Sequence, residues 1–499
     1  MKCTDKKFFD TGKGKNKKNQ LYSNSYFCKI LISIRKFRRL FSLNPTVRSI
    51  IKNTVVFTCS FILTCFIYLL VQTRSPLSDV FTNDRISVLK DRPANITRDI
   101  VIDMYFMPDN GGMITLTRSL IVGIARKRPN WRLLVLISED CASAFDLPRR
   151  DNIKLIKIRA TINPLVLAER IFNSPRLGLL HDKFLQLLCY NRIFYDKYCD
   201  LVWDPLGDSS FCNFVTIPRI STIHDLACFD IDPKFYAMGD YRMKSSMCTE
   251  NSVCFSKKIV TVSEFSKKRI CEHFNVSKDF VKHIPIQLGT RIYSNSTHEE
   301  SAAVLNKYKL KPKKYFIFCS TWWRHKNQIA LMKAFNKFAQ KNLEMKLILV
   351  GKYRGSIETS SIKDFCSDRL IITGFVPDKD LGILLKNALA FIHPSVYEGF
   401  GMPIIEAMIN GIPVACSNVA SLPEVAGSAA LFFDPFDTDS ITQAMHHMAD
   451  DPQLRKDLIQ KGYEQAKKYS DRDAMVDEYI RVMEEVMHEN DLKKATMKK

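Results

Sequence analysis

Short apolar runs alternate with longer segments of helical period from about residue 100 onward. Residues 100–106 (IVIDMYF) and 131–138 (WRLLVLIS) are apolar runs of strand length, and residues 113–125 between them have the apolar spacing of a helix. Strands separated by helices of about 10 to 15 residues predict βαβ units and a parallel sheet. The same alternation predicts further strands at residues 153–158, 201–203, 218–223, 258–262 and 281–286.

The alternation restarts after a polar stretch at residues 287–312, which predicts a linker between two domains. The second series predicts strands at residues 315–319, 345–350, 370–372, 389–392, 413–415 and 430–433, and then helices to about residue 487. We therefore predict an α/β protein with two doubly wound domains at residues 98–290 and 312–470, followed by a C-terminal helix and charged tail at 471–499. Ligands of such sheets bind beyond the carboxyl ends of the strands, so we expect the site in a cleft between the domains.

One segment before the alternating region has the length of a membrane span. Residues 53–73 are 21 consecutive uncharged residues with an apolar centre at 55–71. About 20 apolar residues cross a hydrocarbon layer of ~30 Å as a helix. A buried helix of a soluble domain is the alternative, whereas a cleaved signal peptide fits poorly because the segment lies far from Met1. We predict a single transmembrane anchor at 53–73.

Charge on either side of this segment predicts its orientation. The basic N-terminal head, residues 1–52, carries 14 Lys and Arg against two Asp, whereas residues 74–100 carry five basic and four acidic residues. The positive-inside rule then places the head in the cytoplasm and the long C-terminal part on the extracytoplasmic or lumenal side. The 15 cysteines are odd in number and lack framework spacing, which instead favours a reducing compartment. The cytoplasmic face therefore stays open.

The net charge of +22 makes nucleic-acid binding another candidate function. More than half of this excess lies in the head, because residues 53–499 contain 60 basic and 50 acidic residues, a net charge of +10. The head contains no zinc-finger, RRM or helix-turn-helix pattern. We predict no nucleic-acid partner and assign the head to the flank of the membrane anchor.

The clearest chemical pattern lies in residues 393–427 (HPSVYEGFGMPIIEAMINGIPVACSNVASLPEVAG). Glu398 and Glu406 are eight residues apart, and a helix pattern follows the first of them. Between them lies a turn formed by Gly399, Phe400 and Gly401. Glycines let backbone N–H groups of a loop and of a helix N-terminus approach an anionic phosphate. A carboxylate in the helix can hold paired ribose hydroxyls, as acidic residues do in dinucleotide sites.

This string closely resembles the E-x7-E signature of the retaining glycosyltransferases of family 4, which have the GT-B fold. The resemblance covers about residues 100–470. It implies two Rossmann-like domains facing a cleft, with the nucleotide-sugar donor held by the C-terminal domain and the acceptor by the N-terminal domain. On this resemblance Glu398 holds the donor sugar at the reacting centre and Glu406 holds the ribose.

Segments of the N-terminal half match the same family in order and spacing. Gly111 and Gly112 resemble the glycine loop after the first strand, which approaches the donor phosphates and the acceptor. His224, in a TIHDL segment, resembles the histidine that reaches the donor sugar. Residues 262–266 (VSEFS) resemble an element at a helix start, where we expect Ser263 to be the N-cap and its neighbours to be scaffold.

Residues 320–327 (STWWRHKN) resemble the basic element that follows the first strand of the C-terminal domain in this family. Lys326 and Arg324 are then expected to bind the donor diphosphate as opposite charges in a cleft. The commonest form of the element has Gly-Arg where this chain has Ser320-Thr321, so Arg324 would supply the missing guanidinium.

A divalent metal is the alternative means of holding a diphosphate. Asp230 and Asp232 form a D-x-D pattern, by which GT-A enzymes hold a metal, but the chain repeats this pattern at residues 437–439 and 471–473. Such further occurrences show how easily the pattern arises by chance. We therefore predict no metal and no cofactor apart from the nucleotide-sugar co-substrate.

The sequence thus predicts a membrane-anchored, retaining, metal-independent glycosyltransferase with Glu398 and His224 at the reacting sugar. The resemblance is to mannosyltransferase-type members, which implies GDP-mannose as donor, with a UDP-sugar as the alternative. The acceptor class stays open between a glycan, a lipid-linked molecule and a protein. The competing class is a catalytically inactive GT-B protein that binds nucleotide sugars or acts as a scaffold. The presence of both glutamates, Lys326 and His224 argues against it.

Overall fold

The computed structural model divides into two units, Met1–Thr73 and Arg74–Lys499. The structure describes eight stretches, all in the second unit: residues 92–104, 111–138, 145–158, 199–207, 217–236, 240–288, 296–352 and 368–496. Within these stretches no helix is long and apolar enough to cross a membrane. The head and the predicted anchor at 53–73 lie outside the described residues, so the anchor stays a prediction.

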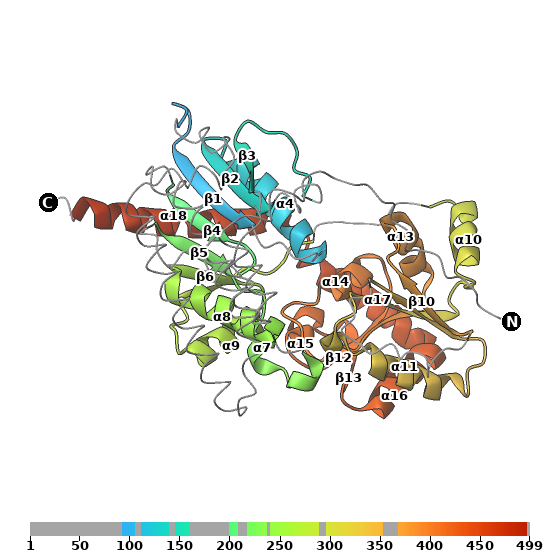
Figure 1. Cartoon of the computed structure of the whole chain (residues 1–499). Coiled ribbons are helices and arrows are strands. Elements are labelled where there is room, and N and C mark those ends of the chain that lie inside the picture. Colours follow the sequence, from blue (N-terminus) through green and yellow to red (C-terminus); the bar gives the residue numbers. More distant parts are fainter. Residues whose placement is uncertain are drawn as a thin grey trace, which may run out of the picture. The chain divides into compact units, whose positions relative to one another are not determined.

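The N-terminal domain is built on a parallel sheet of order β3-β2-β1-β4-β5-β6-β7 (Figure 1). Its strands are β1 (Arg98–Met104), β2 (Trp131–Ser138), β3 (Ile153–Ile158), β4 (Leu201–Asp204), β5 (Arg219–Thr222), β6 (Lys258–Thr261) and β7 (Val281–His283). Ile100, Val101 and Ile102 are all fully buried, so β1 is covered on both faces, as is typical of a central strand in a parallel sheet. The strand order reverses between β1 and β4. In this architecture ligands bind at such a reversal point, beyond the carboxyl ends of the strands.

The C-terminal domain repeats the design with a parallel sheet of order β10-β9-β8-β11-β12-β13. Its strands are β8 (Tyr315–Cys319), β9 (Lys346–Val350), β10 (Leu370–Gly374), β11 (Ala390–His393), β12 (Val414–Ser417) and β13 (Ala430–Phe433). Here the order reverses between β8 and β11. The prediction of two Rossmann-like, doubly wound domains is confirmed, and the loops after β8 and β11 lie at the reversal point.

Helices follow most strands, as the alternating pattern predicts. In the N-terminal domain they are α4 (Gly111–Lys127), α7 (Ala227–Asp230), α8 (Asp240–Phe255) and α9 (Glu264–Phe274), with a 3₁₀ turn η5 (Pro233–Phe235). Beyond residue 296 they are α10 (His298–Lys307), η6 (Arg324–Lys326), α11 (Gln328–Ala339), α13 (Asp378–Asn387), α14 (Met402–Ile409), α15 (Leu422–Ala426), α16 (Thr438–Asp450), α17 (Pro452–Lys467) and α18 (Arg472–Thr496).

Strand positions agree with the sequence prediction to within a few residues. The prediction of a linker at residues 287–312 missed one helix. This helix is α10, which packs against α13. The Thr297 hydroxyl accepts from the Glu300 N–H, and the Glu300 carboxylate accepts from the Thr297 N–H. This capping box starts the helix. The polar composition of the stretch hid a T-x-x-E pattern that predicts a helix start.

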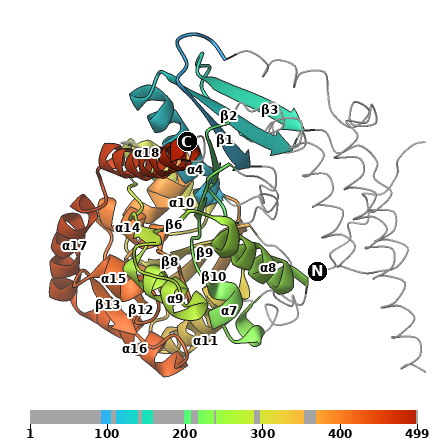
Figure 2. The ribbon, with the colours of Figure 1, turned by 90° about the vertical axis from the view of Figure 1, so that its left-hand side faces the viewer.

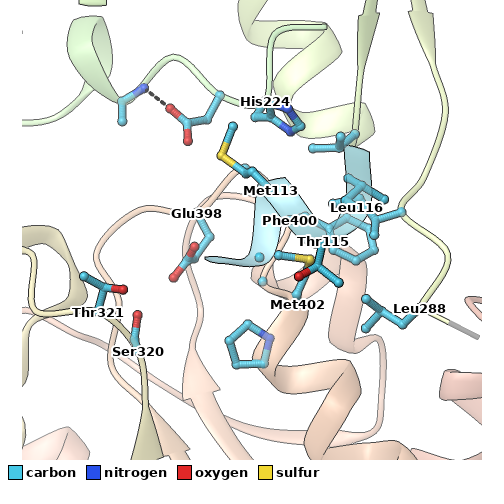
Figure 3. A pocket seen from close by; sticks show the side chains of 18 of the residues that line it. Met113, Thr115, Leu116, His224, Leu288, Ser320, Thr321, Glu398, Phe400 and Met402 are labelled. Carbon is cyan, nitrogen blue, oxygen red and sulfur yellow. Dashed lines mark hydrogen bonds between the residues drawn. The ribbon is translucent and has the colours of Figure 1, made fainter. Parts of the chain in front are cut away.

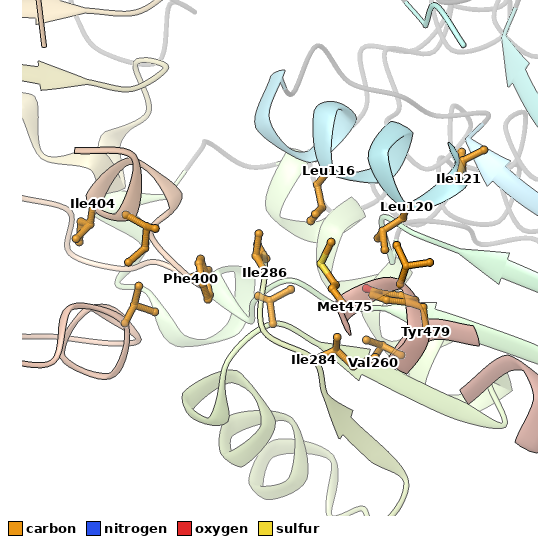
Figure 4. Packing of buried hydrophobic residues seen from close by; sticks show 14 of the residues in the cluster. Leu116, Leu120, Ile121, Val260, Ile284, Ile286, Phe400, Ile404, Met475 and Tyr479 are labelled. Carbon is orange, nitrogen blue, oxygen red and sulfur yellow. The ribbon is translucent and has the colours of Figure 1, made fainter. Parts of the chain in front are cut away.

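The last helix, α18, leaves the C-terminal domain and packs on the N-terminal one, beside α4 (Figures 1 and 2). Its buried face inserts Met475 and Tyr479 among the apolar side chains of α4 and the N-terminal sheet (Figure 4). Val476 takes the space that Gly123 of α4 leaves, because a Cβ on Gly123 would lie 2.5 Å from it. The segment predicted as a helix with a charged tail is therefore part of the N-terminal core.

Candidate active site

A pocket of about 690 Å³ lies where the carboxyl ends of the two sheets face each other, and both domains line it. Most of the predicted site residues line it, namely Gly112, His224, Lys326, Glu398, Gly399, Phe400, Gly401 and Glu406. Figure 3 shows Glu398 between His224 of the N-terminal domain and Ser320 and Thr321 of the C-terminal domain. Gly111, the first residue of α4, directly precedes Gly112. The structure therefore brings together residues that the sequence separates by up to about 300 positions.

Glu398 is the most strongly held side chain of the pocket. The Lys326 ammonium donates to both of its carboxylate oxygens, at 2.7 and 2.8 Å, and Nε2 of His393 donates to Oε1 at 2.9 Å. Burial alone would raise the pKa of Glu398, but Lys326 and then His393 outweigh it and hold this pKa well below its usual range. Glu398 is thus a fixed carboxylate, 9% exposed, at the wall of the pocket.

His393 is a part of the site to which sequence reasoning gave no role. It ends β11, is fully buried, and stacks on Phe391 with ring centroids 5.8 Å apart. A carboxylate only accepts, so Nε2 carries the proton in the bond to Glu398. Its Nδ1 has no hydrogen-bond partner within the described stretches. The sequence signal for this contact was the H-P-S-x-x-E spacing, which places Glu398 five residues after His393 at the end of the strand.

His224 enters the pocket from the loop after β5. Its Nε2 lies 2.9 Å from the carbonyl oxygen of Pro205 and must donate, because a carbonyl only accepts. Burial lowers the pKa of His224, although Pro205 and the neighbouring carboxylates act in the opposite direction. The ring is therefore neutral near pH 7, with Nδ1 as its acceptor.

The glycines of the E-x7-E segment have separate structural reasons. A Cβ on Gly399 would lie 2.1 Å from the His224 carbonyl oxygen, so only glycine allows this loop to touch the His224 segment. Gly401 has φ +97° and precedes α14, a conformation that favours glycine. A Cβ on Gly112 would lie 2.4 Å from Cε of Met402, so α4 and α14 also meet closely.

Two predicted residues take less central positions. Glu406 lies in the second turn of α14, half-buried and lining the pocket. Arg324 belongs to η6 with Lys326, but it is not among the described lining residues, whereas its neighbours Trp323 and His325 are. Arg472, at the start of α18, also lines the pocket, and the sequence prediction did not include it.

The D-x-D residues are engaged in other contacts. The Arg269 guanidinium donates to both oxygens of Asp230, at 2.7 and 3.0 Å, and the Tyr397 hydroxyl donates to Oδ2 at 2.8 Å. Asp232 accepts from the Lys234 N–H at the start of η5. Among the residues that the structure describes, no group of three or more His, Cys, Asp or Glu side chains is placed to hold a metal ion.

Comparison with known proteins agrees with this geometry. Residues 302–465 match the family model "Glycosyl transferases group 1". The crystal structure of Anabaena HepE in complex with UDP-glucose matches with a TM-score of 0.58 at 16% identity, over 78% of this chain and 100% of that chain. The chain has the GT-B glycosyltransferase fold.

Two curated relatives are mannosyltransferases by name. O-antigen chain mannosyltransferase B of Escherichia coli is 33% identical over 255 residues, which cover 50% of this chain and 66% of that protein. O-antigen chain mannosyltransferase RfbU of Salmonella typhimurium is 27% identical over 239 residues, 47% of this chain and 62% of that protein. The chain thus spans less than two thirds of the length of either relative.

Proposed function

We propose that this protein is a retaining, metal-independent glycosyltransferase that transfers a sugar from a nucleotide-sugar donor. The observation that carries the proposal is the pocket between the domains, where Glu398 and Lys326 of one domain face His224 of the other. A basic group can bind the diphosphate of a nucleotide sugar, and an acidic and a neutral group can hydrogen-bond the hydroxyls of the sugar. The match to group 1 glycosyl transferases over the C-terminal domain supports the same function.

In the proposed reaction Lys326 and the amides around Gly399 and Gly401 stabilise the departing diphosphate. Glu398 and His224 hold the hydroxyls of the sugar. The bond between the anomeric carbon and the phosphate oxygen breaks, and the acceptor oxygen bonds to the same face of that carbon. The acceptor proton passes to the departing phosphate oxygen, so the site needs no separate general base. Lys326 must then exchange its bond to Glu398 for one to the diphosphate, while His393 remains on the carboxylate.

For the donor we propose GDP-mannose, because the two curated relatives are mannosyltransferases by name. A UDP-sugar is the alternative, since the solved neighbour holds UDP-glucose. For the acceptor we propose a glycan, and the predicted anchor is compatible with either a lipid-linked or a protein carrier. The function is tested by incubating the enzyme with a panel of nucleotide sugars and measuring donor hydrolysis. Binding without turnover of any of them would favour the inactive scaffold.

Removal of the Glu406 carboxylate tests the donor site. Glu406→Ala is expected to raise the donor KM and to cost about 2–4 kcal/mol in kcat/KM, because two ribose hydroxyls lose their partner. Steady-state kinetics with varied donor measures both constants. Wild-type constants in this variant would remove Glu406 from the donor site.

Chelation tests the proposed metal independence. Lys326 and helix amides would take the place of a divalent cation at the diphosphate, so EDTA is expected to leave the transfer rate largely unchanged. The rate is measured with EDTA and after Mn²⁺ titration. Activity that vanishes with EDTA and returns with Mn²⁺ would contradict the proposal.

Membrane fractions test the anchor and its orientation. We propose that residues 53–73 resist carbonate extraction and that the flanking charges place the pocket on the extracytoplasmic side. Sealed vesicles with the cytoplasmic face outward should then protect residues 398–406 from protease until detergent is added. Digestion without detergent would place the pocket in the cytoplasm, and extraction into the soluble fraction would refute the anchor.

A further inference from the structure

The Glu398 loop is fixed by the opposite domain through its neighbour Tyr397. Tyr397 belongs to the C-terminal domain, yet it is only 7% exposed and packs among apolar side chains of the N-terminal domain. Its hydroxyl donates to Asp230 at 2.8 Å, and its ring lies 5.6 Å from that of Phe265. Arg269 holds both oxygens of Asp230 and so fixes the acceptor of this bond. The loop that carries Glu398 is therefore anchored directly beside it.

A second contact joins the domains at the start of α9. The Glu424 carboxylate, in α15 of the C-terminal domain, accepts from the Glu264 N–H at 2.8 Å and from the Phe265 N–H at 2.9 Å. These N–H groups belong to the first turn of a helix, which lacks internal acceptors and attracts negative charge. Glu424 is exposed, so water can replace the contact at small cost when the domains separate.

Both contacts converge on the reacting centre. Gly399 touches the His224 carbonyl oxygen directly, and Ser266 Oγ, in the first turn of α9, lies 3.3 Å from that same oxygen. Neither Tyr397 nor Glu424 is among the described residues that line the pocket. Any effect of these two side chains on the reaction is therefore indirect, and Glu398 and His224 belong to the two segments that they hold.

We propose that Tyr397 and Glu424 form an interdomain clasp, two positioning residues that bring Glu398 and His224 to the same donor sugar. The proposal rests on the proposed function and adds the residues that assemble the site. A donor held mainly by the C-terminal domain binds whether the domains are together or apart, whereas transfer needs both. Weakening the clasp therefore lowers kcat and leaves the donor affinity nearly unchanged.

The test uses the full-length protein with Tyr397→Phe, Glu424→Gln and the double variant. Tyr397→Phe removes a buried hydrogen bond and shifts the closed state by roughly five- to tenfold. Glu424→Gln keeps one accepting oxygen but loses the second acceptor and the charge, so its shift is smaller, and the two shifts multiply. The double variant is expected to lose at least about tenfold in kcat, with a change in donor KM below about threefold.

Two matched controls make the same side-chain changes inside one domain. Tyr315→Phe loses the hydroxyl bond to the Leu384 carbonyl, at 2.5 Å, and Asp451→Asn alters the cap on the Leu454 N–H, at 2.9 Å. Tyr315→Phe is expected to lower the melting temperature, whereas Asp451→Asn should leave it nearly unchanged, because Asn caps a helix about as well as Asp. Neither control is expected to lower kcat. Equal losses of kcat in controls and clasp variants, or wild-type kcat in the double variant, would overturn the clasp.

Hydrogen exchange provides a readout that does not depend on turnover. The amides of Glu264 and Phe265, and the loop at residues 399–401, should exchange faster in Glu424→Gln and in the double variant than in either control. Unchanged exchange there would overturn the clasp even if the enzyme is active. If the wild type turns over no nucleotide sugar but these amides respond as expected, the proposed function fails, whereas the role of the two contacts in holding the domains together is confirmed.

Discussion

Glu398→Gln is expected to lower kcat/KM by roughly 10²–10³, about the cost of removing one preorganised electrostatic group from a transition state. The carboxylate takes two bonds from Lys326 and one from His393, so its position in the pocket is set before the donor binds. Gln keeps the shape of the side chain but loses the charge that holds sugar hydroxyls and stabilises positive charge developing at the anomeric carbon. The measurement is steady-state kinetics with circular dichroism as a check of folding.

The same substitution has a pH signature that separates catalysis from stability. The pKa of Glu398 is depressed in the folded state, so its contribution to stability is complete above the ordinary carboxyl pKa and is lost as pH falls through the depressed value. The melting temperature of Glu398→Gln should therefore fall less steeply with acid than that of the wild type. A folded variant with wild-type kcat/KM would contradict the role of Glu398 at the sugar.

The order of strands and helices could be predicted from the sequence because parallel strands buried on both faces appear as continuous apolar runs. The runs at residues 131–138 and 315–319 match β2 and β8 residue for residue. Strand ends were less accurate where the buried run continues into a loop, as after β7, which stops at His283 although apolar residues extend to Ile286. Apolarity reports burial, whereas a strand ends where its hydrogen bonds end.

The pocket was predictable as a set of residues but not as a set of bonds. Glu398 and Lys326 were both expected there, yet their direct pairing depends on the distance between loops that are 72 positions apart. Tyr397 and Glu424 belong to the same sequence segment as Glu398. The contact of Tyr397 with Asp230 and that of Glu424 with α9 both cross the domain boundary. A single sequence predicts local structure and composition, but such contacts depend on how two separate domains face each other.

Lys326→Met is expected to abolish transfer and to destabilise the fold by about 3 kcal/mol, because removing one partner leaves the other charge buried and unpaired. The side chains of Lys326 and Glu398 are 16% and 10% exposed, so water screens the remaining carboxylate poorly. Breaking a buried ion pair typically costs about 3–5 kcal/mol. We expect the low end of this range because His393 still donates to Glu398. Transfer fails for a separate reason, since the departing diphosphate loses its cation.

The double variant Lys326→Met/Glu398→Gln separates these two effects. With both charges removed no unpaired ion stays buried, so the double variant should be more stable than Lys326→Met alone, giving a coupling energy of about 1–3 kcal/mol in chemical denaturation. Its transfer activity should remain as low as that of Lys326→Met, because neither the diphosphate nor the sugar regains its partner. Recovered stability with lost activity would show that the ion pair stabilises the fold when no donor is bound. It would also show that each of the two side chains is needed for transfer. If stability losses simply add, the pair contributes nothing as a pair and its 2.7 Å contact is incidental.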